Sequence, residues 1–294
     1  MKWLALVALT ISCSSCSSSP PPVDDGGTDA ATVPTNTTID LDGDANGLYW
    51  DAATSTLFIA DDGNNRILTY TDAAGVTKLV DLPPASASGP GLGQLIPLDD
   101  GSLLVTRFGY GTAGDVVQVM PDTTTNIITG LDPTRRRIGL ARADDGSIFD
   151  TYFVKNGTAY VGSVAKLSLA GTETDVVTSL QKPVGVLVTG GTLFFDDQST
   201  NTLYSTPAAS PGASTQFALL PDADLLCVGP NGTMFSGGAD GNVRQIDASG
   251  AVTVFATGFA GARGVAYDAA NHRLFIANHV GASGPNTVEV RPVP

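Results

Sequence analysis

The chain has 294 residues, with 29 acidic side chains against 15 basic ones and a formal net charge of −14 at pH 7. A charge of this sign disfavours nucleic acid and anionic surfaces as partners. Cys227 is the only cysteine after residue 16, so no disulfide can form within the rest of the chain. Aspartate, asparagine and glycine far outnumber glutamate, which occurs only as Glu173 and Glu289, and this composition favours turns over helices.

The first residues, MKWLALVALTISCSSC, hold one lysine and a short apolar run from Trp3 to Ile11. The run is too short to span a bilayer and is typical of a secretory signal, so we expect the mature protein to be exported. The segment resembles a bacterial lipoprotein signal, which implies that residues 1–12 are removed and that Cys13 carries the lipid, with Cys16 as the alternative. Residues 13–36 are small, polar and proline-rich, which predicts a disordered tether. Contact with a membrane is expected only through the lipid.

The next stretch, DLDGDANGLYWD, has two interpretations. Asp42, Asp44 and Asn46, followed by Gly47, match the start of an EF-hand calcium loop. Ala53 stands where that loop needs a bidentate acid, and no helical pattern flanks it. We therefore expect a polar turn that enters a strand at Asn46.

An internal repeat dominates residues 37–294. Segments of the form strand, turn, strand recur six times, often with Asp-Gly or Asn-Gly in the turn, and a third and usually a fourth alternating strand follow each one. The six segments begin at Asn46, Gly93, Ile138, Val184, Asp224 and Arg263. Four strands that recur at this period indicate a β-propeller blade, so the sequence predicts a single all-β domain with six blades. A β-sandwich would not account for the longer self-similarity.

The last repeat stops after its third strand, TVEVRP, while the mature chain begins with an isolated strand, TTIDL. An open edge strand leaves backbone groups unpaired, and closed propellers avoid this. We therefore expect residues 37–41 to complete the sixth blade and close the ring.

The motif LFIADDGNNRILTY is similar to the repeat of NHL propellers. The segments NGLYWD and DLLCVGPNG are similar to the innermost strands of the SMP-30/gluconolactonase family. This resemblance implies that the start of each innermost strand and the end of each second strand face one mouth of a central channel. The residues at which the six repeats start would form a first ring around this mouth. The second ring would be Asp61, Arg107, Tyr152, Asp197, Gly238 and Asn278.

The same resemblance implies a divalent cation, calcium or similar, held in the channel by carboxylate and asparagine oxygens. Asp224 matches one such ligand, and Asn46 stands in place of another, the carboxylate of the first blade. Ile138 and Val184 occupy places where asparagines are expected, and two oxygen ligands are too few for a tight site. The polar ring residues form the candidate ligand site: Asn46, Asp61, Arg107, Tyr152, Asp197, Asp224, Arg263 and Asn278. The alternative is that these acids and bases only pair with each other.

Outside the rings, His279 is the only histidine placed to act as a general base, although no nucleophile elbow accompanies it. The basic spot Arg135–Arg137 is expected on a solvated loop near the mouth. Residues 106–115, TRFGYGTAGD, form a glycine-rich loop that is either a lid or a plain connection. Cys227 is expected to be a buried small hydrophobe.

Two function classes follow from the sequence. The first is a monomeric, lipid-anchored propeller that binds a small polar molecule, a glycan or a protein without turnover. The second is a metal-dependent lactone hydrolase of the SMP-30 type. The apolar residues in the first ring favour binding without a metal.

Overall fold

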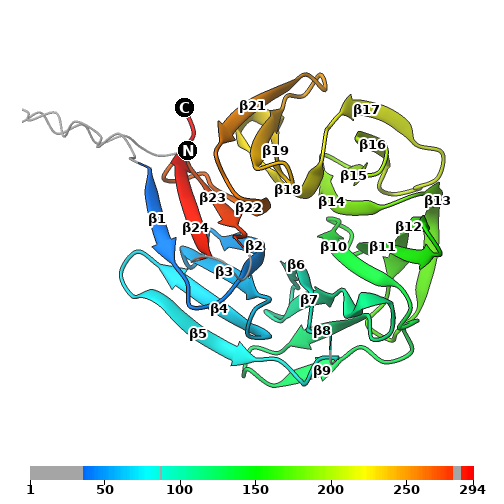
Figure 1. The fold of residues 1–294 in the computed structure, drawn as a ribbon, viewed down its shortest axis with the longest axis horizontal. Coiled ribbons are helices and arrows are strands. Elements are labelled where there is room, and N and C mark those ends of the chain that lie inside the picture. The colour runs from blue at the N-terminus through cyan, green and yellow to red at the C-terminus, as the bar shows by residue number, and fades with distance from the viewer. Residues whose placement is uncertain (1–35, 87, 281–285) are drawn as a thin grey trace, which may run out of the picture. The chain divides into compact units, whose positions relative to one another are not determined.

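The computed structural model describes residues 36–86, 88–280 and 286–294, which form six four-stranded antiparallel sheets around a common centre (Figure 1). The prediction of a six-bladed β-propeller with four strands in each blade is confirmed. The expected signal and nearly all of the expected tether, with Cys13 and Cys16, lie outside the described residues. Within the described ranges, no helix is long and apolar enough to cross a membrane.

The first three blades follow one another along the chain. Blade one consists of β2 (Ala45–Asp51), β3 (Thr56–Asp61), β4 (Arg66–Thr71) and β5 (Gly75–Asp81). Blade two consists of β6 (Leu92–Pro97), β7 (Leu103–Arg107), β8 (Asp115–Val119) and β9 (Thr125–Ile127), with the 3₁₀ turn η1 (Gly109–Gly111) after β7. Blade three consists of β10 (Arg136–Arg142), β11 (Ile148–Asn156), β12 (Ala159–Leu167) and β13 (Glu173–Leu180).

The remaining three blades repeat the pattern. Blade four consists of β14 (Pro183–Thr189), β15 (Thr192–Asp197), β16 (Thr202–Pro207) and β17 (Thr215–Leu219). Blade five consists of β18 (Ala223–Val228), β19 (Met234–Gly238), β20 (Asn242–Ile246) and β21 (Val252–Thr257), with the 3₁₀ turn η2 (Pro230–Gly232) after β18. Blade six consists of β22 (Ala262–Asp268), β23 (Arg273–Asn278), β24 (Thr287–Pro292) and β1 (Thr37–Asp40).

The outermost strand of blade six comes from the other end of the described chain. β1 pairs antiparallel with β24, with Thr37 opposite Val290 and Asp40 opposite Thr287. The two ends of the described chain therefore share one sheet (Figure 1).

The ambiguous stretch from Asp40 to Asp51 is a turn that enters a strand, as expected. β2 begins at Ala45. Just before it, the Asp42 carboxylate pairs with Arg66, and the backbone N–H of Asp44 donates to Asp61 Oδ1 at 2.8 Å.

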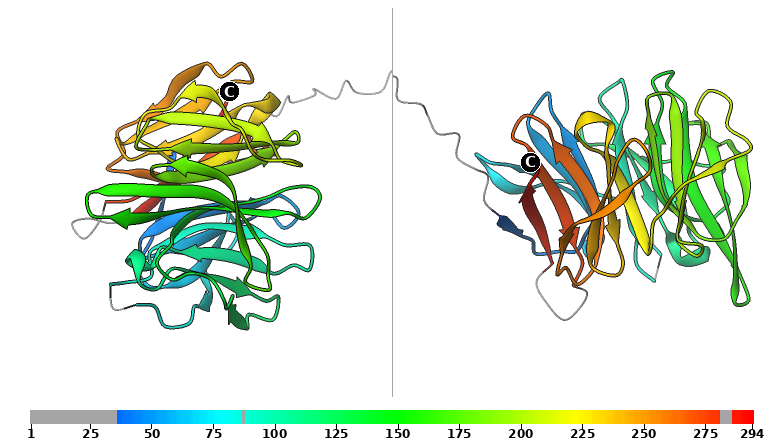
Figure 2. Two further views of the ribbon diagram at one scale, coloured as in Figure 1. Left: turned by 90° about the vertical axis from the view of Figure 1, so that its right-hand side faces the viewer. Right: turned by 90° about the horizontal axis from the view of Figure 1, so that it is seen from above.

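The apolar core is divided among the spaces between neighbouring blades, since alternate residues of each strand point to opposite faces of its sheet. The cluster between blades six and one includes Leu48 and Phe275, and there Trp50 stacks on Phe275 with ring centroids 5.3 Å apart. Each innermost strand also contacts the next around the centre, and β22 contacts β2. The side views in Figure 2 show the tilted sheets stacked against one another.

Glycines allow the innermost strands to approach one another closely. A Cβ atom on Gly47 would lie 2.2 Å from the carbonyl oxygen of Gly93 on β6, and one on Gly264 would lie 2.1 Å from that of Asn46 on β2. No side chain fits at such distances, so glycine is required where these backbones meet.

Every innermost strand is irregular at its start. In β2 the register shifts between Ala45 and Leu48, and the same shift occurs in β6, β10, β14, β18 and β22. An extra residue in one strand bends it and turns a side chain away from the sheet's regular alternation. In all six blades, the first-ring residue is the first of the two unpaired residues in this bulge.

Candidate functional site

The bulged residues of the six blades line one cavity at the end of the channel. Its volume is about 270 Å³, and the whole first ring contributes to it: Asn46, Gly93, Ile138, Val184, Asp224 and Arg263. The bulges explain this convergence, because each one turns the same position of its strand toward the centre.

The second ring expected from the sequence lies elsewhere. None of Asp61, Arg107, Tyr152, Asp197, Gly238 and Asn278 lines this cavity. Each of these residues pairs in register with the residue directly before the bulge of its innermost strand, as Asp61 does with Ala45 and Asn278 with Ala262. Their side chains therefore share the face of those buried partners, away from the cavity.

The polar members of the expected second ring have structural partners instead. Asp61 accepts from Arg66 Nε at 2.6 Å, and Arg107 forms a bidentate pair with Asp115 at 2.6 and 2.7 Å. Asp197 accepts the backbone N–H groups of residues 181 and 182, at 2.8 and 2.9 Å. Asn278 Oδ1 accepts from the backbone of Ala260 at 3.0 Å. In the part of the chain that the structure describes, none of these four residues pairs with another residue of the expected rings; their partners include Arg66, Asp115 and backbone N–H groups.

The residue that follows each of these positions does line the cavity in five of the blades: Asp62, Phe108, Phe153, Gln198 and His279. The expected ring was therefore displaced by one residue. Side chains alternate between the two faces of a strand, so a shift of one residue moves a side chain to the opposite face of the sheet. This alternation in the sequence could have identified the correct residue.

His279 and Asp44 form a close polar pair in the cavity. His279 Nδ1 lies 2.6 Å from Asp44 Oδ1, and the two side chains are 33% and 16% exposed. A carboxylate oxygen accepts in such a contact, so the hydrogen lies on Nδ1 and Nε2 is the ring nitrogen not engaged by Asp44. Asp62 lies on the same wall and accepts from the backbone N–H of Leu92 at 2.8 Å. Burial raises the pKa of Asp62, so this acid ionises less readily than an exposed aspartate.

Two cations act on one buried acid in another part of the cavity wall. Asp224 Oδ2 lies 3.4 Å from Arg263 Nη1, with side-chain exposures of 4% for the acid and 36% for the arginine. Lys182 Nζ donates to Gln198 Oε1, and Gln198 Nε2 donates to the backbone oxygen of Ala223 at 2.8 Å. Burial raises the pKa of Asp224, while Arg263 and then Lys182 act to lower it. The wall thus carries two cationic side chains for one carboxyl group.

An apolar wall completes the cavity on the side of blades two and three. Ile138 and Phe153 come from blade three, and Phe108 and Tyr110 from blade two. The Phe108 ring meets the rings of Tyr110 and Phe153 edge-on, with centroids 5.2 and 5.6 Å apart. The cavity therefore joins a polar half to an aromatic half.

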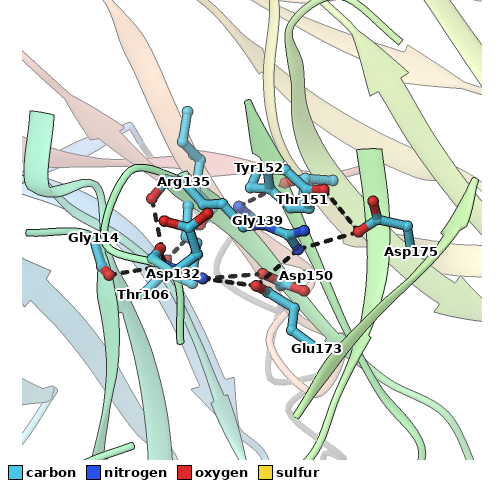
Figure 3. A network of polar contacts seen from close by, with 12 residues as sticks. Thr106, Gly114, Asp132, Arg135, Gly139, Asp150, Thr151, Tyr152, Glu173 and Asp175 are labelled. Carbon is cyan, nitrogen blue, oxygen red and sulfur yellow. Dashed lines mark hydrogen bonds and ion pairs between the residues drawn. The ribbon is translucent and has the colours of Figure 1, made fainter. Parts of the chain in front are cut away.

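The basic spot Arg135–Arg137 does not lie on a solvated loop, and this expectation is corrected. Arg137 is fully buried in blade three, where Nε and Nη2 donate to Glu173 at 2.8 Å each. Glu173 lies beside Asp150 in this polar network (Figure 3). Arg135 stacks over the ring of Tyr152 at 3.9 Å, and the Tyr152 hydroxyl donates to Asp175 at 2.7 Å. Acids of β13 pair with Arg135 and Arg137, while Arg136 donates to the backbone oxygen of Tyr110 at 3.0 Å.

The first ring does not fit a hard divalent cation. Calcium and magnesium take about six oxygen ligands. Asn46 and Asp224 are the only oxygen side chains of the first ring, and Arg263 already lies beside Asp224. Asn46 turns its amide nitrogen to the backbone oxygen of Leu92 at 2.6 Å. Ile138 and Val184 supply only hydrocarbon.

Comparison with known proteins found no matching protein-family model and no matching curated protein. Solved structures do match, and they show the fold. A gluconolactonase from Xanthomonas campestris has a TM-score of 0.69 and 20% identity, with 88% of this chain and 89% of that chain covered. Regucalcin from Agrobacterium tumefaciens, described as a calcium-binding protein, has a TM-score of 0.66 and 16% identity, with 88% of this chain and 94% of that chain covered. Virginiamycin B lyase from Staphylococcus aureus has a TM-score of 0.62 and 12% identity, with 87% of this chain and 98% of that chain covered. Structural neighbours of this chain thus include six-bladed propellers of the SMP-30/gluconolactonase type.

Proposed function

We propose that this protein binds a small organic acid, or the lactone of such an acid, in the cavity at the channel mouth. The observation that carries the proposal is the cationic wall, where Arg263 and Lys182 flank the single carboxyl group of Asp224. The contact between Arg263 and Asp224 is long, and more than a third of the arginine side chain is exposed. Its guanidinium therefore has donors left for a ligand carboxylate or carbonyl.

The size of the cavity favours a small molecule over a glycan chain or a protein segment. About 270 Å³ is close to the lower end of the range for small-molecule sites, roughly 300–1,000 Å³. We further propose that the protein acts after export, as a monomer held to a membrane by a lipid on Cys13.

Hydrolysis of a lactone is a second candidate function, and the pair of His279 and Asp44 is the observation that favours it. His279 Nε2 would accept a proton from a water molecule as the water oxygen attacks the lactone carbonyl. The ring C–O bond then breaks, and the same proton passes to the departing alkoxide, which yields the hydroxy acid. The likeness to a gluconolactonase supports this reaction class, although the proposed step needs no metal.

The two functions are separated by calorimetric titration with acetate, phenylacetate, gluconate and glucono-δ-lactone, together with a lactone hydrolysis assay. We expect Arg263→Gln to weaken acid binding at least tenfold, about 1.4 kcal/mol, because it removes a charge-assisted hydrogen bond. His279→Ala should abolish any lactone turnover and leave gluconate binding within about threefold. Absence of saturable binding to all four compounds contradicts the proposal, and turnover that persists in His279→Ala contradicts the second candidate.

A further inference from the structure

The backbone at Tyr110 is strained. Tyr110 lies at the centre of η1 with φ 54° and ψ 22°, which is the left-handed region. Side chains with a Cβ pay an energetic cost there, and a bulky residue in this region is unusual. The other non-glycine residues with positive φ in the described part of the chain carry Asn, Asp, Ser, Thr or His side chains. Tyr110 is the one phenol among them.

Several hydrogen bonds hold this conformation in place. Arg136 Nη2 donates to the carbonyl oxygen of Tyr110 at 3.0 Å. The backbone N–H of Phe108 donates to Gly91 at 2.7 Å, and those of Thr112 and Ala113 donate to Gly109 at 3.1 Å. A strained backbone persists only when its surroundings fix it in this way, and such strain is concentrated at ligand-binding and catalytic sites.

The strain places an aromatic ring at the edge of the candidate site. Tyr110 lines the cavity and is 42% exposed. A Cβ on Gly91 would lie 3.4 Å from the Tyr110 ring and 2.6 Å from Phe108 Cβ, so the missing side chain at Gly91 makes room for both aromatic residues. Asp62, Arg263 and Asp44 all act electrostatically on the Tyr110 hydroxyl. The residue therefore faces the charged groups of the cavity across its opening.

We propose that Tyr110 determines specificity by packing its ring against a flat apolar face of the ligand. This inference rests on the proposed function, in which Arg263 receives the ligand's anionic group. A ring left 42% exposed gains little from burial in the free protein, and it gains more when a ligand covers it. Phe108 and Phe153 extend the same aromatic surface into the cavity. The favoured ligand class is therefore an organic acid that carries an aromatic or similarly flat ring.

The test compares phenylacetate, which has a ring, with acetate, which lacks one, by calorimetric titration of four proteins. The unmodified protein should bind phenylacetate at least tenfold more tightly than acetate. Tyr110→Gly should reduce this ratio about fivefold through loss of phenylacetate affinity alone, while Tyr110→Phe should preserve it because the ring remains. Asn231→Gly is the matched control, since Asn231 has nearly the same backbone angles, φ 54° and ψ 34°, in η2 and does not line the cavity. It should leave both affinities unchanged.

Tyr110→Gly should fold normally, with a melting temperature within about 2 °C of the unmodified protein, because relief of strain offsets the lost ring contacts. A phenylacetate affinity that Tyr110→Gly leaves intact while Arg263→Gln reduces it overturns the inference and leaves the proposed function standing. If the unmodified protein binds neither phenylacetate nor acetate but does bind gluconate or glucono-δ-lactone, only the role of Tyr110 fails; if it binds none of the four compounds, both fail together. If it binds both acids equally, only the role of Tyr110 fails.

Discussion

One buried guanidinium sets the protonation of two acids in blade three. Arg137 donates twice to Glu173 at 2.8 Å, whereas its Nε lies 3.6 Å from Asp150 Oδ2. Burial, and then the charge of Glu173, raise the pKa of Asp150 well above its usual range. Burial alone would raise the pKa of Glu173 as well, but the hydrogen bonds from Arg137 and Asp150, together with the charges of Arg137 and Arg135, outweigh it and lower that pKa. Asp150 therefore keeps its proton to a higher pH than Glu173 does.

Replacement of these two acids by their amides should have opposite effects on stability. A carboxyl group with a raised pKa binds a proton on folding, so its contribution falls as pH rises from the unfolded value through the folded one. Asp150→Asn should remove this loss. The variant should therefore melt at a higher temperature than the unmodified protein at pH 8, and the difference between the two should be smaller at pH 5. Glu173→Gln leaves Arg137 buried without its counter-charge and should cost about 3 kcal/mol. Thermal melts of the three proteins from pH 5 to pH 8 provide the measurement, and an equal loss in both variants would argue against the assignment.

At the scale of single residues, the sequence predicts one ring of the candidate site and misplaces the other. The first ring was predictable because each repeat starts at the same position, and a repeat is visible without a structure. The second ring depended on which face of a strand its last residue occupies. Asp61 and Asp62 are adjacent and chemically identical, yet one is buried against Arg66 and the other lines the cavity. Only the pairing register separates them, and neighbouring strands set that register.

At the scale of elements, the strand count was predictable because it depends on local patterns. Alternating apolar residues define the strands, and aspartate-based turns such as Asp100 to Ser102 define their ends, with the Ser102 N–H donating to Asp100 at 2.9 Å. The bulges that aim the first ring were not predictable, because they depend on contacts between blades. The tight contact of Gly264 with Asn46 is one example.

Removal of β1 should destabilise the protein far more than removal of the segment before it. Deletion of residues 37–41 leaves the outer edge of β24 unpaired and uncovers Val288 and Val290, which are buried. We expect the loss to be several kcal/mol, since backbone pairs and apolar burial disappear together. Deletion of residues 17–34 is the control and should leave the melting temperature unchanged. Equal melting temperatures for the two truncations would contradict the role assigned to β1.

At the scale of the whole molecule, the ring of blades brings residues that are far apart in the sequence to one cavity. Asp44 lies next to His279, 235 positions away in the chain, and Asp224 of blade five meets Arg263 of blade six, 39 positions away. The balance of acidic and basic side chains in the cavity therefore arises only when the ring is assembled. The same balance decides whether a divalent cation binds there.

Calcium should not stabilise this protein. With Arg263 beside Asp224 and hydrocarbon at Ile138 and Val184, addition of millimolar calcium or of a chelator should leave the melting temperature unchanged. Asp224→Asn should cost about 1 kcal/mol with or without calcium, because Arg263 is exposed enough to regain water. The double variant Asp224→Asn with Arg263→Gln should recover part of that loss. Stabilisation of the unmodified protein by about 2.7 kcal/mol, expected at a 100-fold excess over the dissociation constant, would instead indicate a metal site.

The same bulge recurs in all six blades, although the side chain at the bulged position differs in each blade. Six different residue types occupy that one conformation here: asparagine, glycine, isoleucine, valine, aspartate and arginine. A substitution at five of these positions can change the cavity while the hydrogen bonds of its blade remain; at Gly93 a Cβ atom would lie 2.3 Å from the carbonyl oxygen of Ile138, so glycine is required there. Five positions that vary independently still give a very large number of combinations on a single scaffold. Evolution can therefore exchange one reaction or ligand for another within this fold by changing a few codons, without rebuilding a sheet.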